Sequence, residues 1–115
     1  MKIIGRGSFE RCPLLSEVMI PSSVTTIGKY AFHECKSLVQ LTIPSSVNKN
    51  YPGSFLRCSS LKSIEIPQGV TVIEENTFGQ CLSLEKVFLP SSINKIINGA
   101  FIQCPLLKEV TVPSS

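Results

Sequence analysis

Hydrophobic residues in this chain recur with a period of 23 positions, and mainly polar residues fill the places between them. The most regular columns contain a phenylalanine, a cysteine three residues later and a leucine three residues after that. Their members are Phe9, Phe32, Phe55, Phe78, Phe101, Cys12, Cys35, Cys58, Cys81, Cys104, Leu15, Leu38, Leu61, Leu84 and Leu107. No insertion or deletion interrupts this register. A fixed period of this length predicts a solenoid built from five equivalent units.

Each unit contains two segments with strand character. Around Gln40 to Ile43 polar and apolar residues alternate, as in a strand with one buried face. Pro44 then ends the strand, because proline cannot donate to a β-ladder. The β-branched segment Val24 to Ile27, with counterparts at 70–73 and 93–96, predicts a second short extended stretch.

Between this second stretch and the next alternating strand, the pattern predicts a helix of one or two turns. Within residues 30–36, Phe32 and Cys35 are three positions apart and would lie on one helical face. Glycines stand near the start of this segment, where the chain must bend tightly: Gly28, Gly53 and Gly99.

A unit of 23 residues cannot bury its own apolar columns, so equivalent residues of neighbouring units must stack. We therefore expect one domain, 1–115, with a parallel β-sheet on one face and short helical turns on the other. Its five coils would be residues 1–23, 24–46, 47–69, 70–92 and 93–115. In this register Met1 occupies the valine column, while Val112 and Pro113 complete the last strand and its turn.

Composition and charge exclude several classes of protein. Hydrophobic content of 43% and charged content of 17% exclude an ordinary disordered chain, and no apolar run approaches the roughly 18 residues of a membrane span. The net charge of +3 comes from lysine and arginine scattered among glutamates, which is not a nucleic-acid footprint. Aspartate is absent, and no glycine-rich phosphate loop is visible. We expect no enzyme and no cofactor.

The cysteine column predicts a row of core thiols. Five is an odd number, so the cysteines cannot all be paired in disulfides. Parallel side chains one coil apart, about 4.8 Å, would hold their Cβ atoms farther apart than the roughly 3.8 Å of a disulfide. The spacing also matches no zinc site, whose ligands come in close pairs. The single histidine, His33, is expected to be a solvated surface residue.

The repeat resembles a known family. The unit Ile27-Gly-Lys-Tyr-Ala-Phe-His-Glu-Cys-Lys-Ser-Leu-Val-Gln-Leu-Thr-Ile-Pro-Ser-Ser-Val47 is similar to the BspA-like leucine-rich repeat, and the resemblance covers essentially all 115 residues. It implies an α/β leucine-rich-repeat solenoid that is right-handed and curved. It also implies binding of other proteins or of cell-surface material.

The third unit departs from this pattern. It reads Asn50-Tyr-Pro-Gly-Ser-Phe55, with Asn50 in place of an inward isoleucine and Pro52 where a helix could begin. One interpretation is a functional kink, and the other is sequence drift with Tyr51 filling the gap. In the fifth unit Ile97 replaces a glycine and adds exposed apolar surface.

The outward positions of the alternating strands vary while the core columns stay nearly fixed, which is typical of a binding face. Met19 and Phe88 would place apolar groups on an otherwise polar sheet, where an aromatic side chain can anchor a partner. The alternative is an ordinary surface with two stray apolar residues. The predicted protein-binding face is Met19, Val39, Gln40, Thr42, Lys62, Glu65, Glu85, Lys86, Phe88, Lys108 and Thr111.

These observations predict a non-catalytic protein-protein interaction module that binds a protein partner through its exposed strand face. The resemblance suggests an adhesion role, whereas a cytoskeletal or signalling partner would suit an intracellular adaptor. The alternative is a structural, self-assembling repeat or a surface adhesion fragment of a longer array. No nucleic acid and no membrane insertion are expected.

Two further expectations concern the ends and the compartment. No polar cap is visible at either end, so the open coils predict self-association into a homo-oligomer. The first eleven residues lack the apolar stretch of a signal peptide, and together with the free cysteines this favours the cytoplasm. The family resemblance points instead to the cell surface.

Overall fold

The structure is a computed structural model that describes residues 2–111 and, among these, every side chain except that of Asn50. The column positions expected for Met1, Val112 and Pro113, and the inward side chain expected at Asn50, therefore lie outside the described residues.

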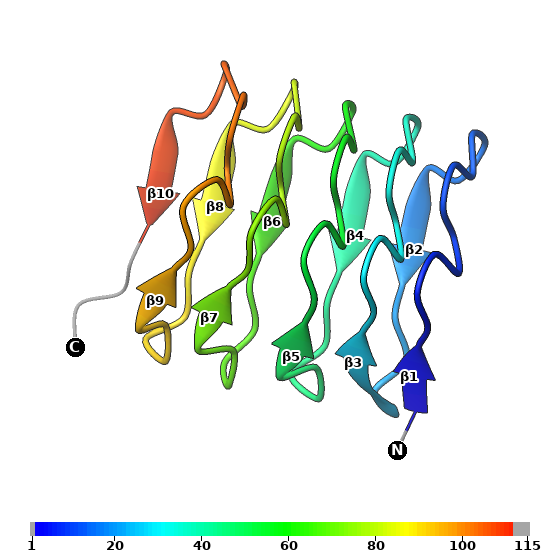
Figure 1. The fold of residues 1–115 in the computed structure, drawn as a ribbon, viewed down its shortest axis with the longest axis vertical. Coiled ribbons are helices and arrows are strands. Elements are labelled where there is room, and N and C mark those ends of the chain that lie inside the picture. Colours follow the sequence, from blue (N-terminus) through cyan, green and yellow to red (C-terminus); the bar gives the residue numbers. More distant parts are fainter. Residues whose placement is uncertain (1, 112–115) are drawn as a thin grey trace.

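The chain winds into about five coils of roughly 23 residues, each contributing short strands to two rows (Figure 1). The first row contains the predicted alternating strands: β2 (Glu17–Met19), β4 (Gln40–Thr42), β6 (Ser63–Glu65), β8 (Lys86–Phe88) and β10 (Glu109–Thr111). The second row contains β1 (Lys2–Ile4), β3 (Val24–Ile27), β5 (Lys49–Asn50), β7 (Val72–Ile73) and β9 (Lys95–Ile96). Both kinds of predicted strand are confirmed.

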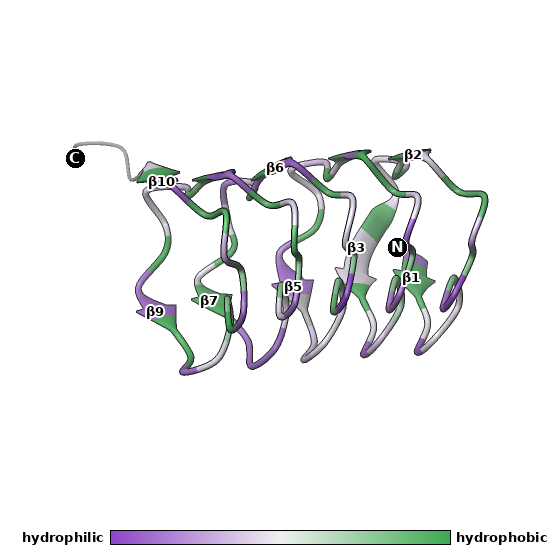
Figure 2. Cartoon of the chain, turned by 90° about the horizontal axis from the view of Figure 1, so that it is seen from above, coloured by the Kyte–Doolittle hydropathy of each residue, from purple (hydrophilic) through white to green (hydrophobic). Residues whose placement is uncertain are grey.

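Neighbouring coils pair as parallel strands, and the pairing reproduces the 23-residue period. Val18 lies opposite Leu41 in the β2–β4 pair, and Ile64 lies opposite Val87 in the β6–β8 pair. In the first row β2 pairs with β4, and β6, β8 and β10 form a three-stranded sheet. In the second row the sheets are β1-β3-β5 and β7-β9. Seen from above, the coils succeed one another along a single axis with the first row of strands along one side (Figure 2).

The predicted helical turns are wrong, since residues 2–111 contain no helix. In the segment that was expected to be helical, successive backbone amides donate alternately to a carbonyl of their own coil and to a carbonyl of the following coil. Ala31 donates to the carbonyl of Gly28 in its own coil (3.2 Å), and the next amide, that of Phe32, donates to Ser54 in the following coil (2.8 Å). An α-helix would send every amide to the fourth preceding residue. The three-residue spacing of Phe32 and Cys35 is satisfied equally well by successive tight turns.

These turns require left-handed backbone at two positions of each coil. The first column is Gly7, Tyr30, Gly53, Asn76 and Gly99, and the second is Arg11, Glu34, Arg57, Gln80 and Gln103, with φ between 54° and 86°. Glycine adopts this conformation without steric cost, whereas a side chain costs about 1 kcal/mol or more.

The ring of Tyr30 explains why the third coil has a glycine at position 53. Tyr30 adopts φ 59° where the equivalent residue in three other coils is glycine. Its ring lies against Gly53 so closely that a Cβ atom at Gly53 would come within 2.5 Å of the ring. Tyr51 does not fill a gap in the core: its side chain is exposed, with the Lys49 ammonium 4.9 Å from its ring centroid.

The predicted side-chain ladders form the core. The five phenylalanine rings stack nearly parallel, with centroids 5.2 to 5.5 Å apart. Phe32, Phe55 and Phe78 are fully buried, while Phe9 in the first coil is 40% exposed. The leucines Leu38, Leu61 and Leu84 are completely buried beside them.

We expect Phe55→Ala to lower the free energy of unfolding by about 3–5 kcal/mol, because it leaves a cavity between two stacked rings. Chemical denaturation followed by circular dichroism measures this loss. Phe88→Ala is the matched control, since Phe88 is 39% exposed on the strand face and its truncation should cost much less. Equal midpoints for the two variants would contradict the phenylalanine ladder.

Candidate protein-binding face

The first row of strands presents its side chains alternately inward and outward. In β4, β6 and β8 the central residues Leu41, Ile64 and Val87 are buried, and the residues on either side are exposed. The alternation of apolar and polar residues in the sequence therefore determines which side chains form the exposed strand face. The inward position is apolar in every coil, and the outward positions are free to vary.

The structure places the predicted face residues together on this side of the molecule. Ten of the eleven are exposed, and Glu85 is half-buried. Three of the exposed residues are apolar: Met19 is 82% exposed, Val39 45% and Phe88 39%.

The two ends of the face differ in charge. Over the first two coils its outward residues are Ser16, Glu17, Met19, Val39, Gln40 and Thr42, with one charge among them. Over the last three coils they are Lys62, Ser63, Glu65, Glu85, Lys86, Phe88, Lys108, Glu109 and Thr111, with one lysine and one glutamate in each coil. The face thus offers an almost uncharged half and a mixed-charge half.

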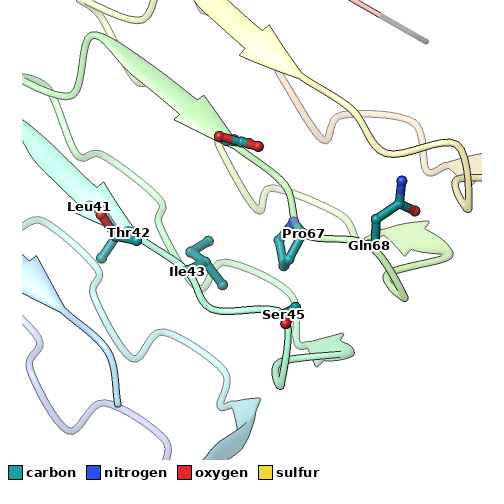
Figure 3. A pocket seen from close by; sticks show the side chains of 7 residues that line it. Leu41, Thr42, Ile43, Ser45, Pro67 and Gln68 are labelled. Carbon is teal, nitrogen blue, oxygen red and sulfur yellow. The ribbon is translucent and has the colours of Figure 1, made fainter. Parts of the chain in front are cut away.

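A groove separates these halves, and the sequence pattern does not predict it. β4 and β6 are neighbours in space but belong to different sheets. Here a groove of about 340 Å³ is lined by Leu41, Thr42, Ile43, Ser45, Glu65, Pro67 and Gln68. Figure 3 shows Leu41, Thr42 and Ile43 following one another along one coil, with Pro67 and Gln68 on the next.

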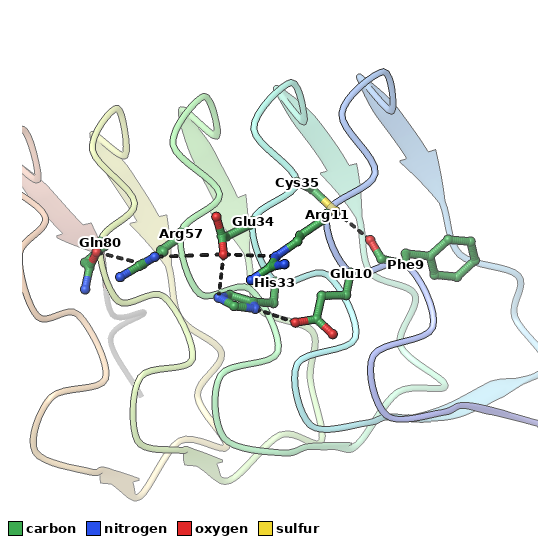
Figure 4. Close-up of polar contacts among 8 residues, drawn as sticks. All are labelled: Phe9, Glu10, Arg11, His33, Glu34, Cys35, Arg57 and Gln80. Atoms are coloured by element: carbon green, nitrogen blue, oxygen red, sulfur yellow. Dashed lines mark hydrogen bonds and ion pairs between the residues drawn. The ribbon is translucent and has the colours of Figure 1, made fainter.

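A polar cluster lies on the turn side of the coils, away from the strand face (Figure 4). His33 Nδ1 is 2.9 Å from Glu10 Oε2, and His33 Nε2 is 3.4 Å from Glu34 Oε1. Arg11 Nε also lies 3.4 Å from Glu34, and Arg57 Nη1 lies 3.8 Å from it. The hydrogen bond with His33 lowers the pKa of the Glu10 carboxyl below its usual value.

This cluster corrects the expectation that His33 is a solvated surface residue. Its side chain is only 15% exposed, because stacking brings Glu10, 23 positions earlier, beside it. The cluster has no available nucleophile, since the neighbouring Cys35 thiol donates to the carbonyl of Phe9 at 3.1 Å. We interpret the cluster as structural: its ion pairs join adjacent coils and contribute the modest stabilisation that partly exposed ion pairs give.

The cysteines form a ladder of thiols in the core. Cys35, Cys58 and Cys81 are completely buried, and the end members Cys12 and Cys104 are half-buried. All five are free. Each of the last four donates through its sulfur to the carbonyl of the phenylalanine 26 positions earlier, as Cys58 does to Phe32 at 3.2 Å. Burial raises the pKa of the Cys58 thiol to about 12.

No metal centre or membrane-crossing helix is found in the part of the chain that the structure describes. Within residues 2–111 no three histidine, cysteine or acidic side chains are grouped so that they could hold a metal ion. Over the same residues no helix is long and apolar enough to cross a bilayer.

We expect stability to fall in alkaline solution partly through Cys58. Above its ordinary pKa of about 9 the unfolded thiol ionises, whereas the folded thiol keeps its proton until about pH 12. The free energy of unfolding should therefore fall by about 1 kcal/mol for each pH unit from this thiol between pH 9 and 12. Urea unfolding of the reduced protein at pH 8 to 10.5 measures the slope.

Cys58→Ala should have a shallower slope than the parent chain, whatever its stability at neutral pH. Parallel slopes for the two proteins would show that the Cys58 thiol is not held protonated by burial.

Solved structures of similar proteins share this fold. A leucine rich cell surface protein of Faecalibacterium prausnitzii is 36% identical, with a TM-score of 0.92 over 98% of this chain. A leucine-rich repeat protein of T. pallidum is 35% identical, with a TM-score of 0.90 over 94% of it. One from Eubacterium ventriosum is 28% identical, with a TM-score of 0.82 over 97% of it. The present chain spans 30%, 50% and 29% of those three chains.

Among proteins with curated descriptions, none matches the chain. A family model, described as BspA type leucine rich repeat region (6 copies), matches residues 2–115. The sequence motif, the parallel coils and this match agree, and the chain belongs to the BspA-type leucine-rich repeat family.

Proposed function

We propose that the chain is a non-catalytic interaction module that binds a protein partner through the exposed side of β2, β4, β6, β8 and β10. The observation that carries this proposal is the contrast within each strand. The inward residues repeat from coil to coil, whereas the outward residues differ and include Met19 and Phe88 in exposed positions. Repeat solenoids commonly bind partners over such extended faces.

The two halves of the face would contribute differently to binding. Phe88 can bury a large ring against a partner, and Met19 can adapt its flexible side chain to an irregular surface. The charged residues around Phe88 would add selectivity more than affinity, because exposed ion pairs are weak.

We place this activity at the cell surface. The F. prausnitzii protein of known structure is described as a leucine rich cell surface protein, and this chain resembles it closely in fold. The cytoplasmic location expected from the free cysteines loses much of its basis, because Cys35, Cys58 and Cys81 are buried and hydrogen-bonded rather than exposed to oxidants.

Capture of partners by the immobilised chain, followed by mass spectrometry, tests the strand face. Phe88→Ala should lower the affinity of a captured partner about tenfold or more, as expected for an aromatic anchor. Leu82→Ala is the matched control, because Leu82 lies in the same coil, is 52% exposed and stands outside the strand face. Lys62→Glu with Lys86→Glu should also weaken capture, while Lys36→Glu with Lys95→Glu should not. Equal effects of face and control variants would exclude this face.

A second role, self-association, is favoured by the exposed apolar residues of the outer coils. In the first coil Ile3 is 66% exposed and Leu14 91%; in the fifth coil Ile102 is 49% exposed and Leu106 46%. Every internal boundary packs one coil against the next, and a contact between the fifth coil of one copy and the first coil of another would repeat this packing. Such a head-to-tail contact does not close on itself and would build chains of copies.

Sedimentation velocity over a range of micromolar concentrations tests self-association. The average mass should rise with concentration, and Leu14→Glu or Ile102→Glu should each return the protein to a monomer. Leu82→Glu should leave the association unchanged, since Leu82 is exposed in an inner coil. A parent chain that stays monomeric throughout would rule out this role.

A further inference from the structure

β4 and β6 lie side by side without the hydrogen bonds that join the other strands of this row. At the β6–β8 boundary the amide of Ile66 donates to the carbonyl of Phe88 and the amide of Glu85 to that of Lys62, each at 2.9 Å. The β2–β4 and β8–β10 boundaries carry equivalent bonds.

At the β4–β6 boundary the corresponding groups are not joined. They are the amide of Ile43 with the carbonyl of Glu65, and the amide of Lys62 with the carbonyl of Val39. All four residues lie within the described range, and none of these bonds forms. Of these groups, the amide of Ile43 and the carbonyl of Glu65 belong to residues that line the groove, so one donor and one acceptor are unpaired there.

The opening is local, because the same two coils are joined elsewhere. On the turn side the amides of Phe32 and Glu34 each donate across this boundary at 2.8 Å, and the rings of Phe32 and Phe55 stack at 5.4 Å. β3 and β5 pair across it as well. The solenoid thus holds the groove open on the strand face while remaining continuous behind it.

The groove combines an apolar floor with one charge. The partly exposed Ile43 and Pro67 supply apolar surface, and Glu65 is the only charged residue among those lining it. Lys62, three residues before Glu65, does not line the groove, and within residues 2–111 no ion pair is formed by Glu65. A carboxylate without an ion-pair partner, on a residue whose own carbonyl is unpaired, favours a cation with several hydrogen-bond donors.

We propose that the groove between β4 and β6 binds an arginine side chain presented by a protein partner. The methylene stem would lie over the partly exposed Ile43 and Pro67. The planar guanidinium, with five donors, would reach the Glu65 carboxylate and its unpaired carbonyl together, which the compact ammonium of lysine suits less well. This inference rests on the proposed function and names the chemistry that the strand face selects.

Titration of the ¹⁵N-labelled chain with Nα-acetylarginine amide, followed by NMR, tests the groove directly. Saturable shifts should be confined to amides around Ile43 and Glu65. The same titration with Nα-acetylcitrulline amide, which has nearly the same shape but no charge, should produce none of these shifts. Glu65→Gln should weaken binding about tenfold, whereas Glu75→Gln, at an exposed glutamate outside the strand face, should not change it. Shifts of equal size with citrulline, or unchanged affinity in Glu65→Gln, would overturn the proposal.

Hydrogen exchange of the free protein provides a second readout that needs no ligand. The amides of Ile43 and Lys62 should exchange at least tenfold faster than their equivalents Ile66 and Glu85, which are hydrogen-bonded. Equal protection would show that β4 and β6 are paired, and the groove site would be withdrawn while the strand-face function stood. Conversely, arginine binding in the groove with no effect of the strand-face variants on partner capture would remove the proposed function alone.

Discussion

The stacking of each residue on its equivalent 23 positions away is the constraint on which this structure depends. No coil has a core of its own: a phenylalanine ring such as Phe55 is covered by Phe32 on one side and Phe78 on the other, at 5.4 Å from each. The backbone obeys the same rule, because strand and turn amides donate to carbonyls of the adjacent coils. Residues that point along the stack must therefore repeat, and residues that point away from it need not.

This division accounts for how much could be predicted from the sequence. The column of phenylalanines and the alternation before each proline specify the coil length, the two rows of strands, their parallel register and the inward residues. The exposed positions of Met19 and Phe88 follow from the same alternation. Each of these features depends on the periodicity of the chain, which can be read from one sequence without an alignment.

Other features depend on how neighbouring coils meet, and the periodicity does not contain them. The supposed helix is a pair of left-handed turns, since a three-residue spacing of Phe32 and Cys35 cannot distinguish the two. A column of glycine and asparagine interrupted by Tyr30 was the available signal. His33 was assigned to solvent because Glu10, its partner, is remote in sequence. The separation of β4 from β6 has no marker in the sequence of either strand.

The direction of the backbone hydrogen bonds has a mechanical consequence. Because the bonds between coils run along the axis of the stack, a force that pulls the two chain ends apart loads the boundaries one after another. Coils should then peel off singly, each releasing 23 residues, or roughly 80 Å of extended chain. The boundary between β4 and β6, with fewer bonds to break, would be the weakest link. Such a chain would lengthen in steps of one coil rather than come apart as a single rigid body.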